Sequence, residues 1–369
     1  MVERKVPNLL VCLHALWAGS FCHLSLAAPI GFRTGEENVT LFNNRNSLDV
    51  AAPPPLVESL DFNGDGHNDL AVLTCSASTG QVRRVDLDVF MSPLQKEDSF
   101  LAGSDMRAYF SRGTNFTLPY PTLSLADVNK DGKGDLIIGR PDVSSNRGNV
   151  EILFGRASPS GSINLDSTAP DLQLLGKPNA LLGLDMAAED FNGDGAGDVA
   201  IGSPGTNECY LLLGGPGLSP GIFDLSQGNP LHRILKSGLG SQVLKADFNR
   251  DGKDDLALSN SEANTGGGTR SGEINIVFGT TTFPSVWTLD SSPENVRVWG
   301  RNSEHILAVG TGDLTGDRRD ELVVGSYSGQ LTVLDGSDVD SVRSVLTPST
   351  GSANTAIFCR VKMGRFSLG

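Results

Sequence analysis

Short runs of apolar residues recur along the chain and are separated by segments rich in Gly, Ser, Asn and Asp. The most apolar runs lie at residues 70–73, 136–138, 199–201, 256–258 and 322–324. Runs of this length that are bounded by turn residues predict buried strands, because an amphipathic helix needs a longer segment with a period of about 3.6 residues. The pattern therefore predicts an all-β protein.

Each of these runs belongs to a longer unit that contains further predicted strands. A shorter apolar stretch precedes the run, and a second β-type run follows it after a turn. The preceding stretches include residues 123–126, 184–187 and 242–244, and the following runs include residues 150–154, 209–213, 274–278 and 331–334. Residues 296–299 add a weaker fourth strand. Four strands repeated in units of roughly 60 residues predict a β-propeller of four-stranded blades. Separate hairpin modules are excluded, because one blade cannot cover both of its own faces.

An acidic loop of nine residues joins the first two predicted strands of each unit. Side-chain oxygens stand at its positions 1, 3, 5 and 9, and Gly stands at position 6 in four of the five copies. This spacing lets one tight loop surround a hard cation with four side chains and the backbone carbonyl of position 7. The loops begin at residues 61, 127, 190, 247 and 313, which is 66, 63, 57 and 66 residues apart. Such a regular long period indicates a repeated supersecondary unit.

The candidate metal ligands are the side chains at positions 1, 3, 5 and 9 and the backbone carbonyl at position 7. They are Asp61, Asn63, Asp65, His67 and Asp69; Asp127, Asn129, Asp131, Lys133 and Asp135; Asp190, Asn192, Asp194, Ala196 and Asp198; Asp247, Asn249, Asp251, Lys253 and Asp255; and Asp313, Thr315, Asp317, Arg319 and Glu321. Oxygen ligands without a Cys or His cluster favour up to five Ca²⁺ ions, with Mg²⁺ as the second choice. The fifth loop is degenerate, because Arg318 replaces the position-6 Gly and Thr315 carries no charge. A solvated Asp/Asn/Gly turn is the alternative for any single copy.

The net charge of −14 is concentrated in these loops. The first four loops each carry three carboxylates at positions 1, 5 and 9 and together hold twelve at these positions, which is four times three. We therefore interpret the acidity as metal-site charge, with a general solubilising role as the alternative. The chain has no basic stripe, which argues against a nucleic-acid partner.

Residues 1–27 are predicted to be a signal peptide. Arg4 and Lys5 supply the charged start, and an apolar stretch follows and ends in small residues. A membrane anchor is the alternative interpretation of this segment. No later segment is long and apolar enough to span a bilayer. We expect a secreted protein in which residues 28–369 form one propeller domain.

Export has consequences for cysteines and for glycosylation. Cys75, Cys209 and Cys359 remain after removal of the signal, and an odd number implies a free thiol or an intermolecular disulfide. Asn38 and Asn115 each begin an Asn-x-Thr acceptor for an N-linked glycan.

The units and their motifs resemble a known family. Phe154-Gly155 and Phe278-Gly279 end predicted strands, and residues 139–141 and 202–204 give Gly-x-Pro after an acidic loop. Over residues 56–340 the chain resembles the FG-GAP repeats of the integrin alpha-chain propeller and its secreted relatives. The resemblance implies a propeller, commonly seven-bladed, with calcium between the first two strands of some blades and a role in adhesion or ligand binding.

The number of blades stays open between five and seven, because only five units carry the acidic loop. Thr74 and Ser259 stand where the Gly-x-Pro motif is expected in the first and fourth units. The lead-in segment 28–57 offers a predicted strand at residues 39–42. This segment is a candidate to complete the last blade, as the first strand of a ring-shaped fold often does.

An enzymatic role has little support in the sequence. Residues 217–221 match the spacing of a nucleophile elbow around Ser219, but Pro220 lacks the backbone N–H that an oxyanion hole requires. The His residues beyond the signal are scattered and too few for a hydrolytic zinc site. We predict that the protein is not an enzyme.

The sequence favours a secreted, calcium-stabilised recognition or adhesion module that binds an extracellular protein or matrix ligand. A glycan-binding propeller of the same architecture is one alternative. A lectin should repeat a stacking aromatic in each blade, whereas Trp287 and Trp299 are the only tryptophans beyond the signal. A non-catalytic relative of an extracellular enzyme that carries these repeats is the other alternative.

Overall fold

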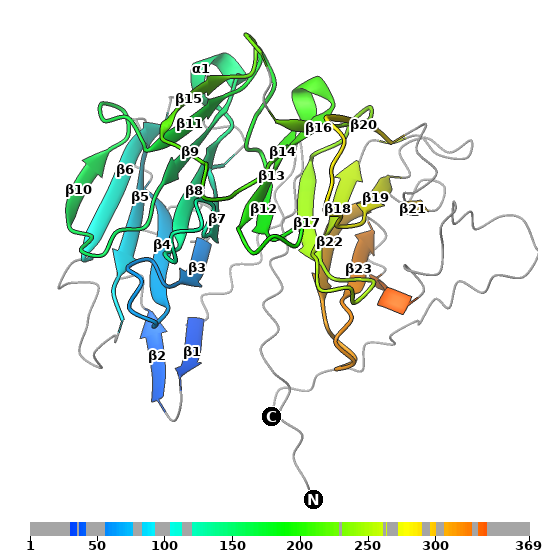
Figure 1. Cartoon of the computed structure of the whole chain (residues 1–369), viewed down its shortest axis with the longest axis horizontal. Helices are drawn as coiled ribbons and strands as arrows, with labels where there is room; N and C mark the ends of the chain where they lie inside the picture. The colour runs from blue at the N-terminus through cyan, green and yellow to red at the C-terminus, as the bar shows by residue number, and fades with distance from the viewer. Residues whose placement is uncertain are drawn as a thin grey trace, which may run out of the picture.

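The computed structural model describes the strands and loops that carry the repeated pattern. The described residues are 30–34, 37–41, 56–76, 83–92, 104–112, 120–228, 231–260, 263, 272–289, 296–299, 306–326 and 331–337. Five of their sheets, which we call blades 1 to 5, are fanned along an arc (Figure 1). The innermost strands of successive blades contact one another. Figure 1 shows the outermost strands β10 and β21 at opposite sides of the molecule.

Blades 1 to 3 each contain five described strands, ordered from the innermost outwards. Blade 1 contains β3 (Leu56–Leu60), β4 (Asp69–Ser76), β5 (Arg83–Phe90), β6 (Met106–Arg112) and β10 (Gly161–Asn164). Blade 2 contains β7 (Thr122–Ala126), β8 (Asp135–Arg140), β9 (Asn149–Leu153), β11 (Leu172–Leu175) and β15 (Gly221–Asp224). Blade 3 contains β12 (Met186–Glu189), β13 (Asp198–Ser203), β14 (Glu208–Leu212), β16 (His232–Leu235) and β20 (Val286–Thr288).

The last two blades have fewer described strands. Blade 4 contains β17 (Gln242–Ala246), β18 (Asp255–Asn260), β19 (Glu273–Val277) and β21 (Val296–Trp299). Blade 5 contains β22 (Ile306–Gly312), β23 (Glu321–Ser326) and β24 (Leu331–Leu334). The remaining elements are β1 (Ile30–Thr34), β2 (Glu37–Leu41), the short α1 (Val143–Asn146) and the 3₁₀ turn η1 (Pro204–Thr206).

The predicted four-stranded unit is present in blades 1 to 4, where consecutive strands of the unit pair antiparallel. The weak strand predicted at residues 296–299 is β21, the fourth strand of blade 4. Each unit is a meander whose first strand lies innermost, which is the arrangement of a propeller blade.

Blades 1, 2 and 3 gain a fifth strand that the sequence pattern did not reveal. β10, β15 and β20 each pair in parallel with the fourth strand of a blade, namely β6, β11 and β16. Each of them comes from the connection between the third and fourth strands of the following blade. The chain therefore reaches back and ties each of these blades to the blade that follows it.

The apolar second strands are buried on both faces, because each face packs against a different neighbouring blade. Val199 and Ile201 of β13 belong to the apolar cluster shared with blade 2, whereas Ala200 belongs to the cluster shared with blade 4. In β8, Ile137 packs towards blade 3 and Leu136 and Ile138 pack towards blade 1. This two-sided burial explains why these runs are continuously apolar instead of alternating.

The prediction for the lead-in strand is wrong as far as the described residues go. β2, which covers residues 39–41 of the predicted strand, pairs antiparallel with β1 in a separate two-stranded sheet rather than with a strand of blade 5. The predicted signal peptide, Asn115 and Cys359 lie outside the described residues. Within the described part of the chain, no helix is long and apolar enough to cross a membrane.

Candidate metal centres

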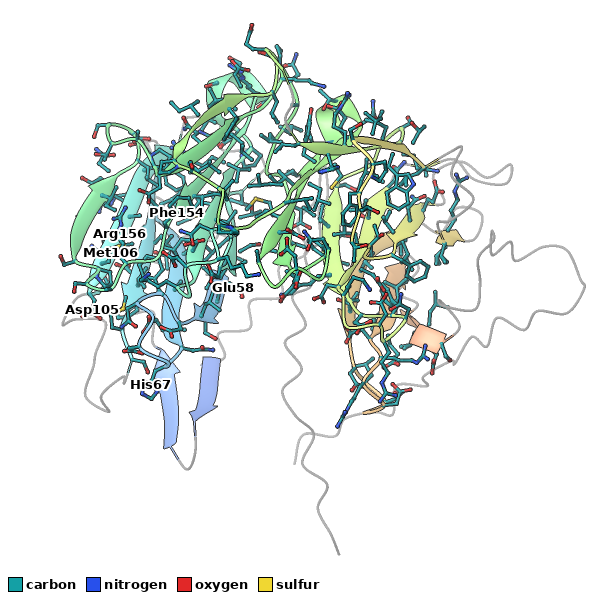
Figure 2. The ribbon with its side chains drawn as sticks, in the orientation of Figure 1. Glu58, His67, Asp105, Met106, Phe154 and Arg156 are labelled. Carbon is teal, nitrogen blue, oxygen red and sulfur yellow. The ribbon has the colours of Figure 1, made fainter. Side chains whose placement is uncertain are left out.

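All five acidic loops occupy the same place in their blades, between the first and second strands. They are named loop 1 (61–69), loop 2 (127–135), loop 3 (190–198), loop 4 (247–255) and loop 5 (313–321). Figure 2 shows His67, the position-7 residue of loop 1, at the rim of blade 1. The repeated pattern thus places the candidate ligands at corresponding positions of five blades.

Loop 3 shows how the candidate ligands are arranged. Asp190 Oδ1 accepts hydrogen bonds from the backbone N–H groups of Gly193 at 2.7 Å and Asp194 at 3.1 Å, and its Oδ2 accepts from Gly195 at 2.8 Å. Asn192 Oδ1 accepts from Asp194 N at 2.7 Å, and Asp194 Oδ1 accepts from Ala196 N at 2.8 Å. The loop therefore wraps around the oxygens of positions 1, 3 and 5.

Position 6 has a backbone conformation that explains its Gly. The φ angle is +87° at Gly66, +83° at Gly132, +81° at Gly195 and +81° at Gly252, which is the left-handed region. In loop 5, Arg318 adopts the same region with φ +70°, and its N–H still reaches Asp313 Oδ2 at 3.0 Å. Loop 5 thus keeps the turn at the expense of a strained non-Gly residue.

The position-9 carboxylates are buried and fasten each loop to the rest of its blade. Asp198 is fully buried, and its Oδ2 accepts from the backbone N–H groups of Phe191 at 3.1 Å and Asn192 at 3.2 Å. Its Oδ1 accepts from Gly214 N at 2.8 Å, just beyond the end of the third strand. The equivalent donors to Asp69, Asp135 and Asp255 are Ser92, Gly155 and Gly279, each at 2.8 Å.

These contacts explain the Phe-Gly motif. A Cβ at Gly155 would lie 2.6 Å from the carbonyl oxygen of Gly134 and 2.8 Å from that of Phe62. Figure 2 labels Phe154 and Arg156, the residues on either side of this glycine. The motif is therefore a requirement of loop packing, since only Gly lets two neighbouring loops approach this closely.

Among the described residues, these buried carboxylates form no ion pair with a positively charged side chain. Burial, together with the nearby carboxylates of positions 1 and 5, raises the pKa of Asp135, Asp198 and Asp255 to about 7, although the backbone N–H donors act to lower it. A buried negative charge without a counter-charge is unfavourable, so each loop has the electrostatics of a cation site.

The donor set fits a hard divalent cation, although the side chains are turned towards the loop's own N–H groups. Among the described residues, no three His, Cys, Asp or Glu side chains stand together in a ready metal-binding group. Each of loops 1 to 4 offers three carboxylates, one amide oxygen and one backbone carbonyl, which is the oxygen set that Ca²⁺ accepts. Binding would therefore require the carboxylates of positions 1 and 5 to give up hydrogen bonds from the loop's N–H groups and to coordinate the ion instead.

Loop 5 differs in its position-9 residue. Glu321 is buried, and its Oε2 accepts from the backbone N–H groups of Leu314 at 2.6 Å and Thr315 at 3.1 Å. The longer side chain thus takes over the role of the aspartates in loops 1 to 4. Thr315 Oγ1 lies 3.5 Å from Glu321 Oε1 and replaces the amide of the other loops.

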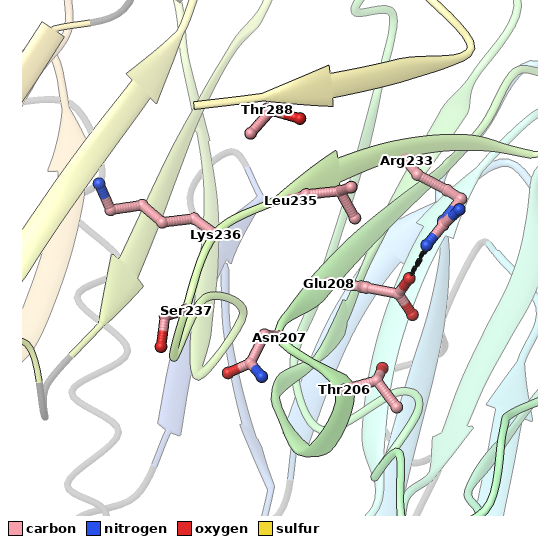
Figure 3. Close-up of a pocket in the computed structure, with 8 residues that line it drawn as sticks. All are labelled: Thr206, Asn207, Glu208, Arg233, Leu235, Lys236, Ser237 and Thr288. Carbon is pink, nitrogen blue, oxygen red and sulfur yellow. Dashed lines mark hydrogen bonds and ion pairs between the residues drawn. The ribbon is translucent and has the colours of Figure 1, made fainter. Parts of the chain in front are cut away.

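A polar pocket on blade 3 escaped the sequence analysis. It is open to solvent, has a volume of about 370 Å³, and lies on η1, β14, β16 and β20 (Figure 3). Its charged residues are already paired: Arg233 contacts Glu208, and Lys236 Nζ lies 3.0 Å from Glu273 Oε1. No motif in the sequence indicates this pocket, because its residues come from separate strands.

The comparisons with known proteins agree with the repeat geometry. A family model described as an FG-GAP-like repeat matches residues 190–258, from the start of loop 3 to β18 after loop 4. The chain carries FG-GAP-like repeats. Together with the blades, this confirms the predicted β-propeller class.

FG-GAP similarity extends to several curated proteins. Phosphatidylinositol-glycan-specific phospholipase D of Homo sapiens is 28% identical over 245 residues, which are 60% of this chain and 28% of that protein. The Rattus norvegicus protein of the same name is 30% identical over 175 residues, which are 42% of this chain and 21% of that protein. Integrin alpha-D of Homo sapiens is 30% identical over 174 residues, which are 44% of this chain and 14% of that protein. The match spans less than a third of each of these relatives.

Proposed function

We propose that this chain is an extracellular, calcium-binding β-propeller that recognises a protein or matrix ligand without catalysing a reaction. The calcium-binding part of this proposal rests on one observation. The position-9 carboxylates Asp135, Asp198 and Asp255 of successive loops are buried, and none forms an ion pair among the described residues. The similarity to integrin alpha-D and to the phospholipase D proteins supports an extracellular location.

The residues of each loop divide the work of holding the ion. The position-9 carboxylate is fixed in advance by two or three N–H donors, as at Asp198. The more exposed carboxylates of positions 1 and 5 would exchange hydrogen bonds from the loop N–H groups for contacts with the cation, and position 7 would supply a backbone carbonyl. A bound Ca²⁺ supplies two positive charges, so it reduces the charge of the three ligand carboxylates in each of loops 1 to 4 from −3 to −1.

Recognition is assigned to loops because a rigid scaffold presents them to solvent. The glycan-binding alternative receives less support, since Trp287 packs against the apolar cluster between blades 3 and 4 and is not a free stacking platform. A protein or matrix ligand is the proposal that the similarity to an integrin alpha chain favours.

A second candidate function follows from the phospholipase D relatives. Their name states an action on phosphatidylinositol glycans, and the chain matches 28% of the human protein. The propeller would then be the non-catalytic repeat part of an enzyme of that class. Incubating the purified chain with a glycosylphosphatidylinositol-anchored protein tests whether the chain is catalytic. Release of the protein from its lipid would refute the non-catalytic proposal.

Calcium titration of the purified full chain by isothermal calorimetry tests the metal proposal. We expect four or five Ca²⁺ ions to bind at extracellular millimolar concentrations, and a chelator to lower the melting temperature. Mg²⁺ at the same concentration serves as the control and should restore less stability, because it prefers fewer protein ligands. A chain that takes up no Ca²⁺ and melts unchanged would refute the metal proposal.

Ligand recognition is tested by direct binding. The purified chain, loaded with Ca²⁺, is passed over immobilised extracellular-matrix proteins and over a glycan array. Saturable binding to a matrix protein that disappears with chelator is the expected result. Binding confined to glycans would replace the proposal by its lectin alternative.

A further inference from the structure

Neighbouring loops are joined by one backbone hydrogen bond that recurs at each junction. The N–H of position 8 in one loop donates to the backbone carbonyl of position 1 in the preceding loop. These bonds are Gly134 N to Asp61 O at 2.7 Å, Gly197 N to Asp127 O at 2.8 Å, Asp254 N to Asp190 O at 3.3 Å, and Asp320 N to Asp247 O at 3.3 Å. The four junctions between five blades therefore share one geometry.

Each of these donors belongs to a peptide group that also carries a candidate ligand. The N–H of Gly134 and the carbonyl of Lys133, which is position 7 of loop 2, are parts of the same planar peptide. In a trans peptide these two groups point in opposite directions, so fixing one fixes the other. A cation that coordinates the position-7 carbonyl of loop 2 therefore also orients the N–H of Gly134, which donates to Asp61 of loop 1.

The acceptor belongs to a second peptide group that leads to a buried carboxylate. The carbonyl of Asp61 shares its peptide with the N–H of Phe62, and that N–H donates to Asp69 Oδ2 at 2.9 Å. The same step is found from Val128 to Asp135 at 2.8 Å and from Phe248 to Asp255 at 3.0 Å. Two peptide groups thus connect position 7 of one loop with position 9 of the preceding loop.

Other contacts hold the same junctions in register. The N–H of Arg156 donates to Phe62 O at 3.0 Å, that of Gly215 to Val128 O at 2.8 Å, and that of Thr280 to Phe191 O at 3.0 Å. The side chain of Lys130 in loop 2 also donates to the carbonyl of Asp194 in loop 3. The rim of the arc is therefore one hydrogen-bonded band and not a row of independent turns.

We propose that divalent cations bind successive loops with positive cooperativity, and that the two shared peptide groups at each junction carry the coupling. This inference rests on the proposed calcium function. A cation in one loop orders the peptide that the preceding loop must otherwise order by itself, so the second ion binds at a lower entropic cost. Hydrogen bonds in series also polarise one another.

Repulsion between the ions acts against this coupling and is reduced by the solvent. The position-5 carboxylates Asp65, Asp131, Asp194 and Asp251 are exposed, so water and salt screen the charges between sites. In each of loops 1 to 4, the three ligand carboxylates also outnumber the two positive charges of the ion. The hydrogen bonds of each junction, in contrast, join backbone groups in direct contact, so solvent and salt do not screen them in this way.

Calcium titrations of four variants test the coupling. For the wild-type chain we expect a Hill coefficient above 1. Asp194→Asn disables loop 3 but keeps the backbone carbonyl that Lys130 contacts at the junction. It should weaken binding at the remaining loops about fivefold or more, as allosteric couplings typically do. Asp105→Asn removes the same charge outside the loops and is the matched control, which should leave binding unchanged.

Two variants of Asp254 address the path itself. Asp254→Pro removes the N–H that loop 4 donates to Asp190, and Asp254→Ala removes only the side chain. The proline variant should lower the Hill coefficient, whereas the alanine variant should keep it. Near-ultraviolet circular dichroism in saturating Ca²⁺ checks that both remain folded, and if the proline variant does not fold, the Asp194→Asn result decides.

The possible outcomes separate this inference from the proposed function. A wild-type chain that binds no Ca²⁺ refutes both. Binding with a Hill coefficient of 1, together with unchanged affinity of the other loops in Asp194→Asn, refutes the coupling and leaves the calcium function intact. Tighter binding at the other loops in Asp194→Asn would also refute it, since that result means that repulsion dominates.

Discussion

Lys177 of blade 2 donates hydrogen bonds to both carboxylate oxygens of Glu208 in blade 3, each at 2.9 Å. The side chain of Glu208 is 4% exposed, and Arg233 and Tyr210 also donate to it. Lys236 Nζ of blade 3 likewise lies 3.0 Å from Glu273 Oε1 of blade 4. The lysine that follows the fourth strand of one blade therefore reaches the third strand of the next.

Glu208→Gln should destabilise the chain, because it leaves Lys177 and Arg233 as partly buried cations without a counter-charge. Breaking a buried pair of this kind costs on the order of 3 kcal/mol in the free energy of unfolding. Urea unfolding of Glu208→Gln, Lys177→Met and the double variant measures the pair in a double-mutant cycle. Additive effects of the two single variants would show that the contact contributes nothing.

The same carboxylate predicts a pH dependence. Burial alone would raise the pKa of Glu208, but hydrogen bonds from Tyr210, Lys177 and Arg233 lower this pKa to about 2. The unfolded chain then binds its proton more readily than the folded chain, so the contribution of Glu208 is complete above the unfolded pKa of about 4.5. It is lost as the pH falls from about 4.5 to about 2.

Acid unfolding of the wild type and of Glu208→Gln checks this dependence. The stability difference between the two proteins should be largest near neutral pH and should shrink between pH values of about 5 and 2. A difference that stays constant over this range would mean that the group titrates at its ordinary value in the folded chain.

Gly214→Ala should destabilise the junction between blades 2 and 3. A Cβ at this position would lie 2.2 Å from the carbonyl oxygen of Gly197 and 2.7 Å from that of Val128. Both neighbours are backbone atoms of loops 2 and 3, so they cannot rotate away, and we expect a loss of about 1–3 kcal/mol or more. The control is Gly217→Ala, whose Cβ meets nothing within 4 Å. Equal urea midpoints for the two variants would contradict the close-approach argument.

Arg318→Gly should stabilise loop 5. Arg318 has a φ angle of +70°, where a side chain is strained and Gly is not. The expected gain is about 1 kcal/mol in the free energy of unfolding, measured by urea denaturation. Arg318→Ala keeps a Cβ in the left-handed region while removing the same guanidinium, so it should show no such gain. A gain of equal size in both variants would assign the effect to charge and not to strain.

The connection that carries the added strand β15 should contribute to stability through its buried residue. Leu225, directly after β15, is 2% exposed and belongs to the apolar cluster between blades 2 and 3. Leu225→Ala should therefore cost about 2–5 kcal/mol. Ile222 of β15 is 62% exposed, so Ile222→Ala should change the unfolding free energy by less than about 0.5 kcal/mol. Thermal denaturation compares the melting temperatures of the two variants. Equal melting temperatures would contradict the prediction.

The sequence by itself determined the repeated unit, its four strands and the place of its acidic loop. These features are local: Asp and Gly at fixed offsets, as from Asp190 to Asp198, define a turn within nine residues, and a short apolar run defines the strand after it. The Phe-Gly motif was also visible at Phe154 and Gly155, although its reason was not.

Tertiary structure decided whatever depends on which segments meet in space. β15 pairs with a strand of another blade, and β2 pairs with β1, because the partner of a strand is set by geometry and not by its own composition. The ion pair of Lys177 with Glu208 and the hydrogen bond from Gly134 to Asp61 join residues that are 31 and 73 positions apart. Such contacts leave no periodic signal along the chain, since only the stacking of one blade on the next brings their atoms together.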